Sequence, residues 1–327
     1  MRRPLALLLA LLAVAGLLAA CDDGGAATTS SSAPKGGLVP EGPAPTPKLP
    51  VTVHSADGRE VTVTDVRRIV PLVGSISEVV FGLGLGPHVV ARDISATFEE
   101  AAKLPLVTRA HDVSAESVLS LRPTLVLADP DTGPPEALEH LRNVGVPVVV
   151  IGKATRVDAI GERIRTIARA LGVPTAGKAL ATRTDAAVDA ARASLPTFNR
   201  PPRIAFLYVR GQASVYLLGG PGAGTDSIIQ AVGGIDAGTA IGLTKQFTPI
   251  TSEAMVQAAP DVLLLTTTGL ESVGGLEGLL KIPGIAQTPA GRHQRVITLE
   301  DGLLFSFGSR TPSALRSIAK QLGDLVR

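Results

Sequence analysis

Aromatic residues are scarce in this sequence. They make up 3% of it, with no tryptophan and two tyrosines, whereas 45% of the residues are hydrophobic, so the core must be mainly aliphatic. An excess of positive charge is also missing. Lys and Arg number 31 against 29 Asp and Glu, and two of those 31 are Arg2 and Arg3. Without these two, basic and acidic residues balance at 29 each. A near-neutral chain argues against a nucleic-acid partner, which usually requires a basic face.

Cysteine occurs once, at Cys21, which excludes an intrachain disulfide. Upstream lies a basic pair and then an apolar run, Leu5 to Leu18, that is short for a membrane span. The small residues Ala19 and Ala20 directly precede the cysteine. This pattern resembles the lipobox of bacterial lipoproteins, which implies cleavage before Cys21, lipidation of its thiol and a position on the extracytoplasmic face of the cell membrane. An ordinary secretory signal with an incidental cysteine is the alternative.

The rest of the chain divides by composition. Residues 22–48 are rich in Gly, Ser, Thr, Ala and Pro, which cannot bury a core and predict a flexible tether. Two valine-rich segments, 51–53 and 61–63, flank Ala56-Asp57-Gly58 and predict a β-hairpin. The expected organisation is a signal peptide (1–20), a tether (21–48), an N-terminal lobe (49–174), an interlobe helix (175–196) and a C-terminal lobe (197–327).

Short aliphatic runs alternate with helical stretches through both lobes. Strands are predicted at 68–72, 89–91, 125–128, 146–151, 203–209, 215–218, 262–266 and 295–299. Helices are predicted at 75–85, with Ser75 or Ser77 as N-cap, at 135–143, and over the alanine-rich 176–195. The alternation predicts an α/β fold with two mostly parallel, Rossmann-like lobes that one long α-helix joins.

A repeat links the two lobes. Residues 114–127 and 251–264 each contain a Ser or Thr, a Glu two residues later, a Pro seven residues after that Glu, and then an aliphatic strand. The hydroxyl residue can cap a short helix, and Glu116 or Glu253 in its first turn suits the helix dipole.

This pairing resembles the solute-binding proteins that carry haem, siderophores and cobalamin, over about residues 66–327. The resemblance implies the class III periplasmic-binding-protein fold, and an ABC importer with its permease and ATPase as partner. It also implies that Glu116 and Glu253 dock on arginines of the permease. The alternative is that each Glu only complements its helix N-terminus.

Two loops carry side chains that suit haem iron. His111 lies in 107–113, directly before the first copy of the repeat, and histidine is a common axial ligand. Tyr208 and Arg210, two residues apart on a predicted strand, share one face. A nearby guanidinium favours the phenolate form of tyrosine, which is a hard anionic ligand for ferric iron. A surface histidine and a structural Tyr–Arg pair are the alternatives.

Together, 111–127 and 206–219 resemble the haem-binding proteins of Gram-positive haem importers (HmuT type). The resemblance implies that His111 and Tyr208 bind the iron of a transported b-type haem from opposite faces and that Arg210 hydrogen-bonds the phenolate. The protein is expected to be a monomer. A ferric siderophore or cobalamin as cargo, and an exported enzyme or haem chaperone that works without a transporter, remain alternatives.

Arg92 and Arg310 lie in loops that could border the ligand, where a guanidinium could meet a haem propionate or simply form a structural pair. The glycine-rich 219–227 lacks the Gly-Lys-Ser/Thr of a phosphate-binding loop. No nucleophile–histidine–acid set is evident in the sequence. We therefore expect a binding protein and not an enzyme.

Overall fold

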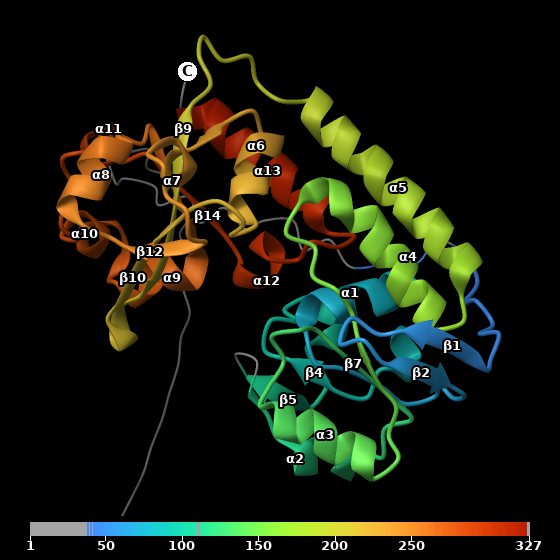
Figure 1. Ribbon diagram of the computed structural model, residues 1–327. Coiled ribbons are helices and arrows are strands. Elements are labelled where there is room, and N and C mark those ends of the chain that lie inside the picture. Colours follow the sequence, from blue (N-terminus) through green and yellow to red (C-terminus); the bar gives the residue numbers. More distant parts are fainter. Residues whose placement is uncertain (1–37, 39, 41, 110–111, 326–327) are drawn as a thin grey trace, which may run out of the picture. The chain divides into compact units, whose positions relative to one another are not determined.

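The computed structural model describes residues 38, 40, 42–109 and 112–325 (Figure 1). The predicted signal peptide, Cys21 and His111 lie outside these residues. None of the described helices is long and apolar enough to cross a membrane. The last part of the segment predicted as a tether packs on the folded chain: Leu38 is buried in an apolar core cluster, Pro45 lies against Gly84, and the N–H of Lys48 donates to the Gly172 carbonyl at 2.9 Å.

The elements before the long helix form an α/β lobe with short strands. The strands are β1 (Val51–His54), β2 (Glu60–Val63), β3 (Ile69–Pro71), β4 (Arg92–Asp93), β5 (Leu106–Arg109), β6 (Asp112–Val113), β7 (Leu125–Ala128) and β8 (Val148–Val150). The α-helices are α1 (Gly74–Gly82), α2 (Ala115–Ser120), α3 (Pro135–Asn143) and α4 (Ile160–Ala170). β1 and β2 make the predicted antiparallel hairpin, and β3, β7 and β8 form a parallel sheet. β5 pairs in parallel with β4 and antiparallel with β6.

The long helix α5 (Pro174–Ala193) begins and ends two residues earlier than predicted. Pro174 takes its first position, where a fixed φ suits a helix and the missing N–H breaks no hydrogen bond. Leu195 is excluded because Pro196 disfavours helical geometry in the residue before it. α5 packs against α4 and against α13 (Thr311–Leu325), so it contacts both lobes (Figure 1).

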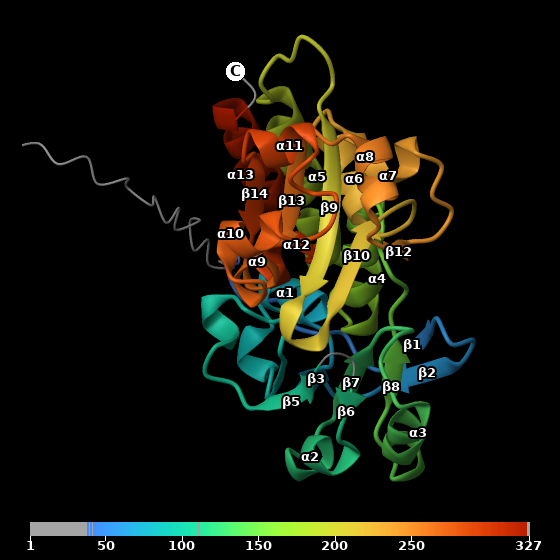
Figure 2. The ribbon, with the colours of Figure 1, turned by 90° about the vertical axis from the view of Figure 1, so that its left-hand side faces the viewer.

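The elements after α5 form the second α/β lobe. Its strands are β9 (Arg203–Arg210), β10 (Val215–Gly219), β11 (Ile235–Asp236), β12 (Phe247–Pro249), β13 (Val262–Thr266) and β14 (Val296–Leu299). Its remaining α-helices are α6 (Thr225–Ala231), α7 (Ala237–Ala240), α8 (Ser252–Ala258), α9 (Thr267–Ser272), α10 (Gly275–Leu280), α11 (Pro289–Arg292) and α12 (Asp301–Leu304). The sheet has the order β12-β10-β9-β13-β14, with β11 beside the start of β9. β9, β13 and β14 run parallel, and β10 runs antiparallel to both of its neighbours (Figure 2).

Aliphatic side chains fill the core, as the composition predicts. One apolar cluster includes Ile164 on α4, Val188 on α5 and Leu315 on α13, so it joins the two lobes. Two further clusters each lie within one lobe, around Val126 and around Leu263. The predicted fold of two α/β lobes joined by one long helix is confirmed.

Two local predictions are wrong. Neither Ser75 nor Ser77 caps α1; its first N–H, that of Gly74, instead meets Asp93 Oδ1 at 3.3 Å and Ser95 Oγ at 3.1 Å. Residues 89–91 form no strand, because the chain makes one bridge at Val89 with Ile69 and then turns to pair with β5. In both places hydrogen bonds to residues distant in the sequence form instead of the local structure that was predicted.

The repeat recurs in the structure. Ser114 Oγ accepts the N–H of Ser117 at the start of α2, and Thr251 Oγ1 accepts the N–H of Ala254 at the start of α8. Each copy then has a left-handed residue directly before its proline, Arg122 (φ 48°) and Ala259 (φ 39°). β7 and β13 follow. The sequence repeat therefore marks a helix–turn–strand unit that occurs once in each lobe.

Candidate ligand site

Tyr208 and Arg210 lie at the end of β9 and form a stacked pair. The Cζ atom of Arg210 lies 4.5 Å from the centroid of the Tyr208 ring. Both side chains are partly exposed, and the tyrosine ring contacts Phe247 at a centroid distance of 6.0 Å. The predicted shared face of the two residues is therefore present. The guanidinium lies over the ring face.

Three acceptors hold the Arg210 guanidinium in this place. Nη1 donates to the Val209 carbonyl at 2.9 Å and to Thr266 Oγ1 at 3.3 Å, and Nη2 donates to Asp301 Oδ1 at 2.8 Å. Asp301 is in turn fixed by Thr268, whose Oγ1 donates to Oδ2 at 2.7 Å. Asp301 is the only charged acceptor among them.

Parallel strands explain why these residues meet. β9, β13 and β14 have their carboxyl ends at one edge of the sheet, which is where ligands of α/β proteins bind. Arg210 ends β9, Thr266 ends β13, and Asp301 follows β14 by two residues. Sequence reasoning missed Thr266 and Asp301. Thr266 ends a predicted strand and Asp301 closely follows another, and these positions could have pointed to the site.

On the first lobe, Arg92 was predicted to lie in a loop but belongs to the short strand β4, because it pairs with Leu106 of β5. Arg92 is half-buried, its Nη1 makes one long contact of 3.4 Å with the Asp93 carbonyl, and its buried Nε has no partner. His111 lies outside the described residues. The residues on either side of positions 110–111, Arg109 and Asp112, pair across β5 and β6.

A close contact joins the loop after Arg92 to the helix that carries Asp301. A Cβ atom added to Gly302 would collide with the Ser95 carbonyl and with Thr97 Oγ1. Only glycine allows this approach between the lobes. At this contact the segment that follows Arg92 touches Gly302 of α12. Gly302 is the residue after Asp301, whose carboxylate holds Arg210.

Arg310, the other candidate for a propionate, is buried and pairs with one buried and one partly exposed carboxylate. Its Nη2 lies 3.2 Å from Glu300 Oε2, and its Nε lies 3.7 Å from Glu78 Oε2. Burial raises the pKa of Glu78 to about 7, against the opposing effect of Arg310. Glu78, on α1, was also missed by sequence reasoning. The side chain of Arg310 thus connects the two lobes.

Glu116 and Glu253 are both exposed, each in the first turn of its helix, α2 or α8. One lies in each lobe. Their surroundings suit either predicted role, a contact with a partner or complementation of a helix dipole.

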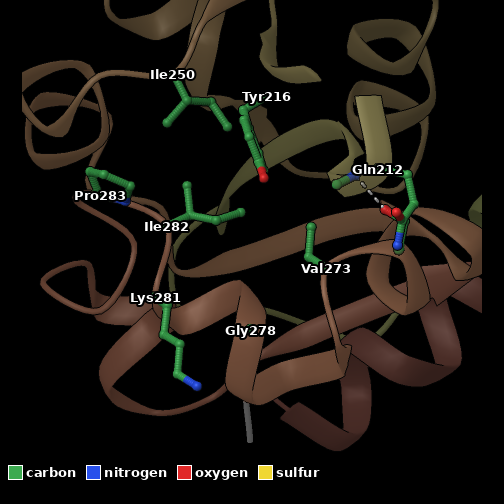
Figure 3. Close-up of a pocket in the computed structure, with 10 residues that line it drawn as sticks. Gln212, Tyr216, Ile250, Val273, Gly278, Lys281, Ile282 and Pro283 are labelled. Carbon is green, nitrogen blue, oxygen red and sulfur yellow. Dashed lines mark hydrogen bonds between the residues drawn. The ribbon is translucent and has the colours of Figure 1, made fainter. Parts of the chain in front are cut away.

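A pocket of about 570 Å³ lies elsewhere in the second lobe (Figure 3). Tyr216, Ile250 and Ile282 line it, with Lys281 at its edge. Tyr216 pairs with Val209, and Tyr208 with Leu217, so the two tyrosines lie on opposite faces of the sheet. The pocket is therefore separate from the Tyr208–Arg210 pair. Within the described residues, no group of three or more His, Cys, Asp and Glu side chains could hold a metal ion.

Comparison with known families gives one clear match. The model of the family described as "Periplasmic binding protein" matches residues 69–303, which is most of the chain. The chain belongs to the periplasmic binding protein family. Its sequence is 24% identical to an uncharacterized ABC transporter substrate-binding lipoprotein, YvrC, of Bacillus subtilis, over 85% of this chain and 87% of that protein. It is 23% identical to the vitamin B12-binding protein of Vibrio parahaemolyticus, over 80% and 91%.

Periplasmic binding proteins of known structure are also similar to this chain, HmuT and RhuT among them. The haem-binding protein HmuT is 37% identical, with a TM-score of 0.83 over 88% of this chain and 94% of that one. The periplasmic haem-binding protein RhuT of Roseiflexus sp. RS-1 is 43% identical, with a TM-score of 0.77 over 80% and 100%. HmuT has also been solved as alanine variants of a histidine, a tyrosine and an arginine, the arginine two residues after the tyrosine. The prediction of a two-lobed binding protein is confirmed.

Proposed function

We propose that this chain is the lipid-anchored, extracytoplasmic substrate-binding protein of an ABC importer and that its cargo is haem. The observation that carries the proposal is the Tyr208–Arg210 pair at the carboxyl edge of β9. The same spacing of tyrosine and arginine occurs among the substituted residues of HmuT. Haem as cargo is also supported by the similarity to HmuT and RhuT, two proteins of known structure that are described as haem-binding proteins.

In this proposal Tyr208 and His111 bind the ferric iron from opposite lobes. A tyrosine oxygen binds iron as phenolate, and the adjacent guanidinium stabilises that negative charge. Phe247 beside Tyr208 offers an apolar contact to the porphyrin. Ile94, 45% exposed on the first lobe, offers a second one; its N–H donates to the Thr108 carbonyl in β5.

The contacts of Arg92 and Arg310 support different roles for the two arginines that could meet a propionate. Arg310 is buried and already paired with two carboxylates, Glu78 and Glu300. Arg92 is half-buried, and its Nε has no partner. A propionate would supply the charged acceptor that Arg92 lacks. We therefore assign propionate binding to Arg92 and a structural role to Arg310.

Delivery and anchoring complete the proposal. Glu116 and Glu253, one per lobe, would contact arginines of the permease, and an exposed ion pair is weak alone, so both would be needed. Cys21 would carry the lipid that holds the protein at the membrane. An ABC partner agrees with the similarity to a substrate-binding lipoprotein.

Titration of the purified protein with hemin tests the cargo. We expect one saturable Soret band at one haem per protein, and a changed band in His111→Ala and Tyr208→Ala. Two matched controls should keep the wild-type spectrum: His140→Ala, an exposed histidine on α3, and Tyr216→Phe on the other sheet face. Cobalamin and a ferric siderophore serve as competitors. Saturable binding of either in place of hemin would overturn the haem assignment.

A further inference from the structure

Arg210 has one charged partner in the described structure, and that partner is not Tyr208. Its Nη2 donates to Asp301 Oδ1 at 2.8 Å, and its other bonds go to a carbonyl and a hydroxyl. A hydrogen bond between two ions is roughly twice as strong as one between neutral groups. Asp301 therefore decides where the guanidinium lies, which is over the ring face of Tyr208.

Asp301 is itself held in place. Thr268 donates to its Oδ2 at 2.7 Å, and Gly302, the next residue, is packed against the loop 95–97 of the first lobe. The side chains of Arg210 and Asp301 are 31% and 23% exposed, so water screens the pair only in part. The carboxylate thus compensates much of the positive charge that the phenolate would otherwise feel.

We propose that Asp301 is a positioning residue that competes with the Tyr208 phenolate for the Arg210 guanidinium. The inference rests on the proposed function. While Asp301 is charged, Arg210 stays shared and the phenolate oxygen keeps its electron density for the iron. Without that charge, Arg210 is free to donate to the phenolate oxygen. Asp301 would thereby strengthen the iron–phenolate bond and slow the loss of the cargo.

The test compares Asp301→Asn with wild type as hemin complexes. A hydrogen bond to the phenolate lowers its electron donation, so the phenolate-to-iron charge-transfer band should move to shorter wavelength. Because a weaker donor binds the iron less strongly, haem loss to excess apomyoglobin should speed up by about two- to fivefold, the scale of one partly exposed charge pair. Asp301→Glu keeps the charge and should restore the wild-type band.

Three further variants separate positioning from mere structural support. In an Arg210→Gln background, Asp301→Asn should change neither the band nor the rate, because the competing guanidinium is gone. Thr268→Val, which removes only the support of Asp301, should shift the band less and in the same direction. Asp189→Asn, in an exposed pair with Arg192 on α5, should leave both readouts unchanged.

The outcomes of the inference and of the proposed function are distinct. If wild type binds no hemin, the proposed function fails. If wild type binds hemin and Asp301→Asn keeps its charge-transfer band and its rate, the inference fails alone. The same holds if Asp301→Asn acts equally with and without Arg210. Thermal unfolding of each apoprotein shows whether a variant has lost its fold. If Asp301→Asn does not fold, Asp301→Glu and Thr268→Val test the inference instead.

Discussion

Glu78 and Arg310, from opposite lobes, meet in the protein interior. The N–H of Arg310 donates to Glu78 Oε1 at 2.6 Å, and the guanidinium Nε lies 3.7 Å from Oε2. The Glu78 side chain is 2% exposed. Burial raises its pKa from an ordinary value of 4.5 to about 7, because Arg310 offsets only part of the cost of removing the carboxylate from water.

This shift predicts how stability depends on pH. Between about pH 4.5 and 7 the native protein keeps a proton on Glu78 that the unfolded chain has released. The free energy of unfolding should therefore fall as pH rises through this window, by up to about 1.4 kcal/mol per pH unit from this group. Urea unfolding at pH 5, 6 and 7 measures the slope. Glu78→Gln cannot ionise and should lose this contribution; an unchanged slope in that variant would contradict the prediction.

Arg92 and Arg310 should differ when each is changed to Gln. Arg92→Gln should weaken hemin binding by about tenfold with little change in stability, since it removes one charge-assisted bond to a propionate. Arg310→Gln should lower the free energy of unfolding by about 2 kcal/mol or more, because it removes the partner of a buried carboxyl group.

Hemin dimethyl ester, whose propionates carry no charge, is the control for this pair. Wild type and Arg92→Gln should bind it equally. If Arg92→Gln weakens both ligands to the same extent, Arg92 acts on the fold and not on the propionate.

The close contact at Gly302 predicts that a larger residue at this position disturbs both lobes. In Gly302→Ala the new methyl group collides with the Ser95 carbonyl and Thr97 Oγ1, so the loop and α12 must separate. Overpacking of this kind costs about 1–3 kcal/mol, and hemin affinity should fall as well because the site draws on both sides of this contact. Chemical denaturation and hemin titration measure the two effects. Gly152→Ala is the matched control, because no atom lies within 4 Å of its added Cβ and its backbone is not left-handed.

Most of the fold could be predicted because its signals are local. The hairpin of β1 and β2, the alanine-rich α5 and the two repeat units each depend on residues within about 20 positions. α1 shows where this reasoning fails. Its first N–H bonds Asp93 and Ser95, about 20 residues ahead, and Ser77, which looked like a cap, is buried. A sequence pattern cannot show which distant loop supplies a cap.

The site shows the same limit. Tyr208 and Arg210 could be paired from their spacing on one strand. Asp301, 91 residues after Arg210, could not, because only the order of the strands brings β9 and β14 to one edge. Glu78 lies in the predicted helix 75–85, and no local pattern shows that Arg310 of the second lobe packs against it. The roles of His111 and Cys21 stay predictions, since both lie outside the described residues.

The first-turn glutamates of the two repeat helices, α2 and α8, are predicted to contact the permease. Glu116 and Glu253 are exposed, and each also complements its own helix dipole, which is worth about 0.3–1 kcal/mol. Glu116→Ala with Glu253→Ala should abolish haem uptake by cells that depend on this protein, while hemin affinity stays at the wild-type value. The matched control replaces Glu136 and Glu277, which are exposed first-turn glutamates of α3 and α10, one in each lobe. That control loses similar helix stabilisation and should keep uptake. If both double variants transport haem equally well, the glutamates serve only their helices.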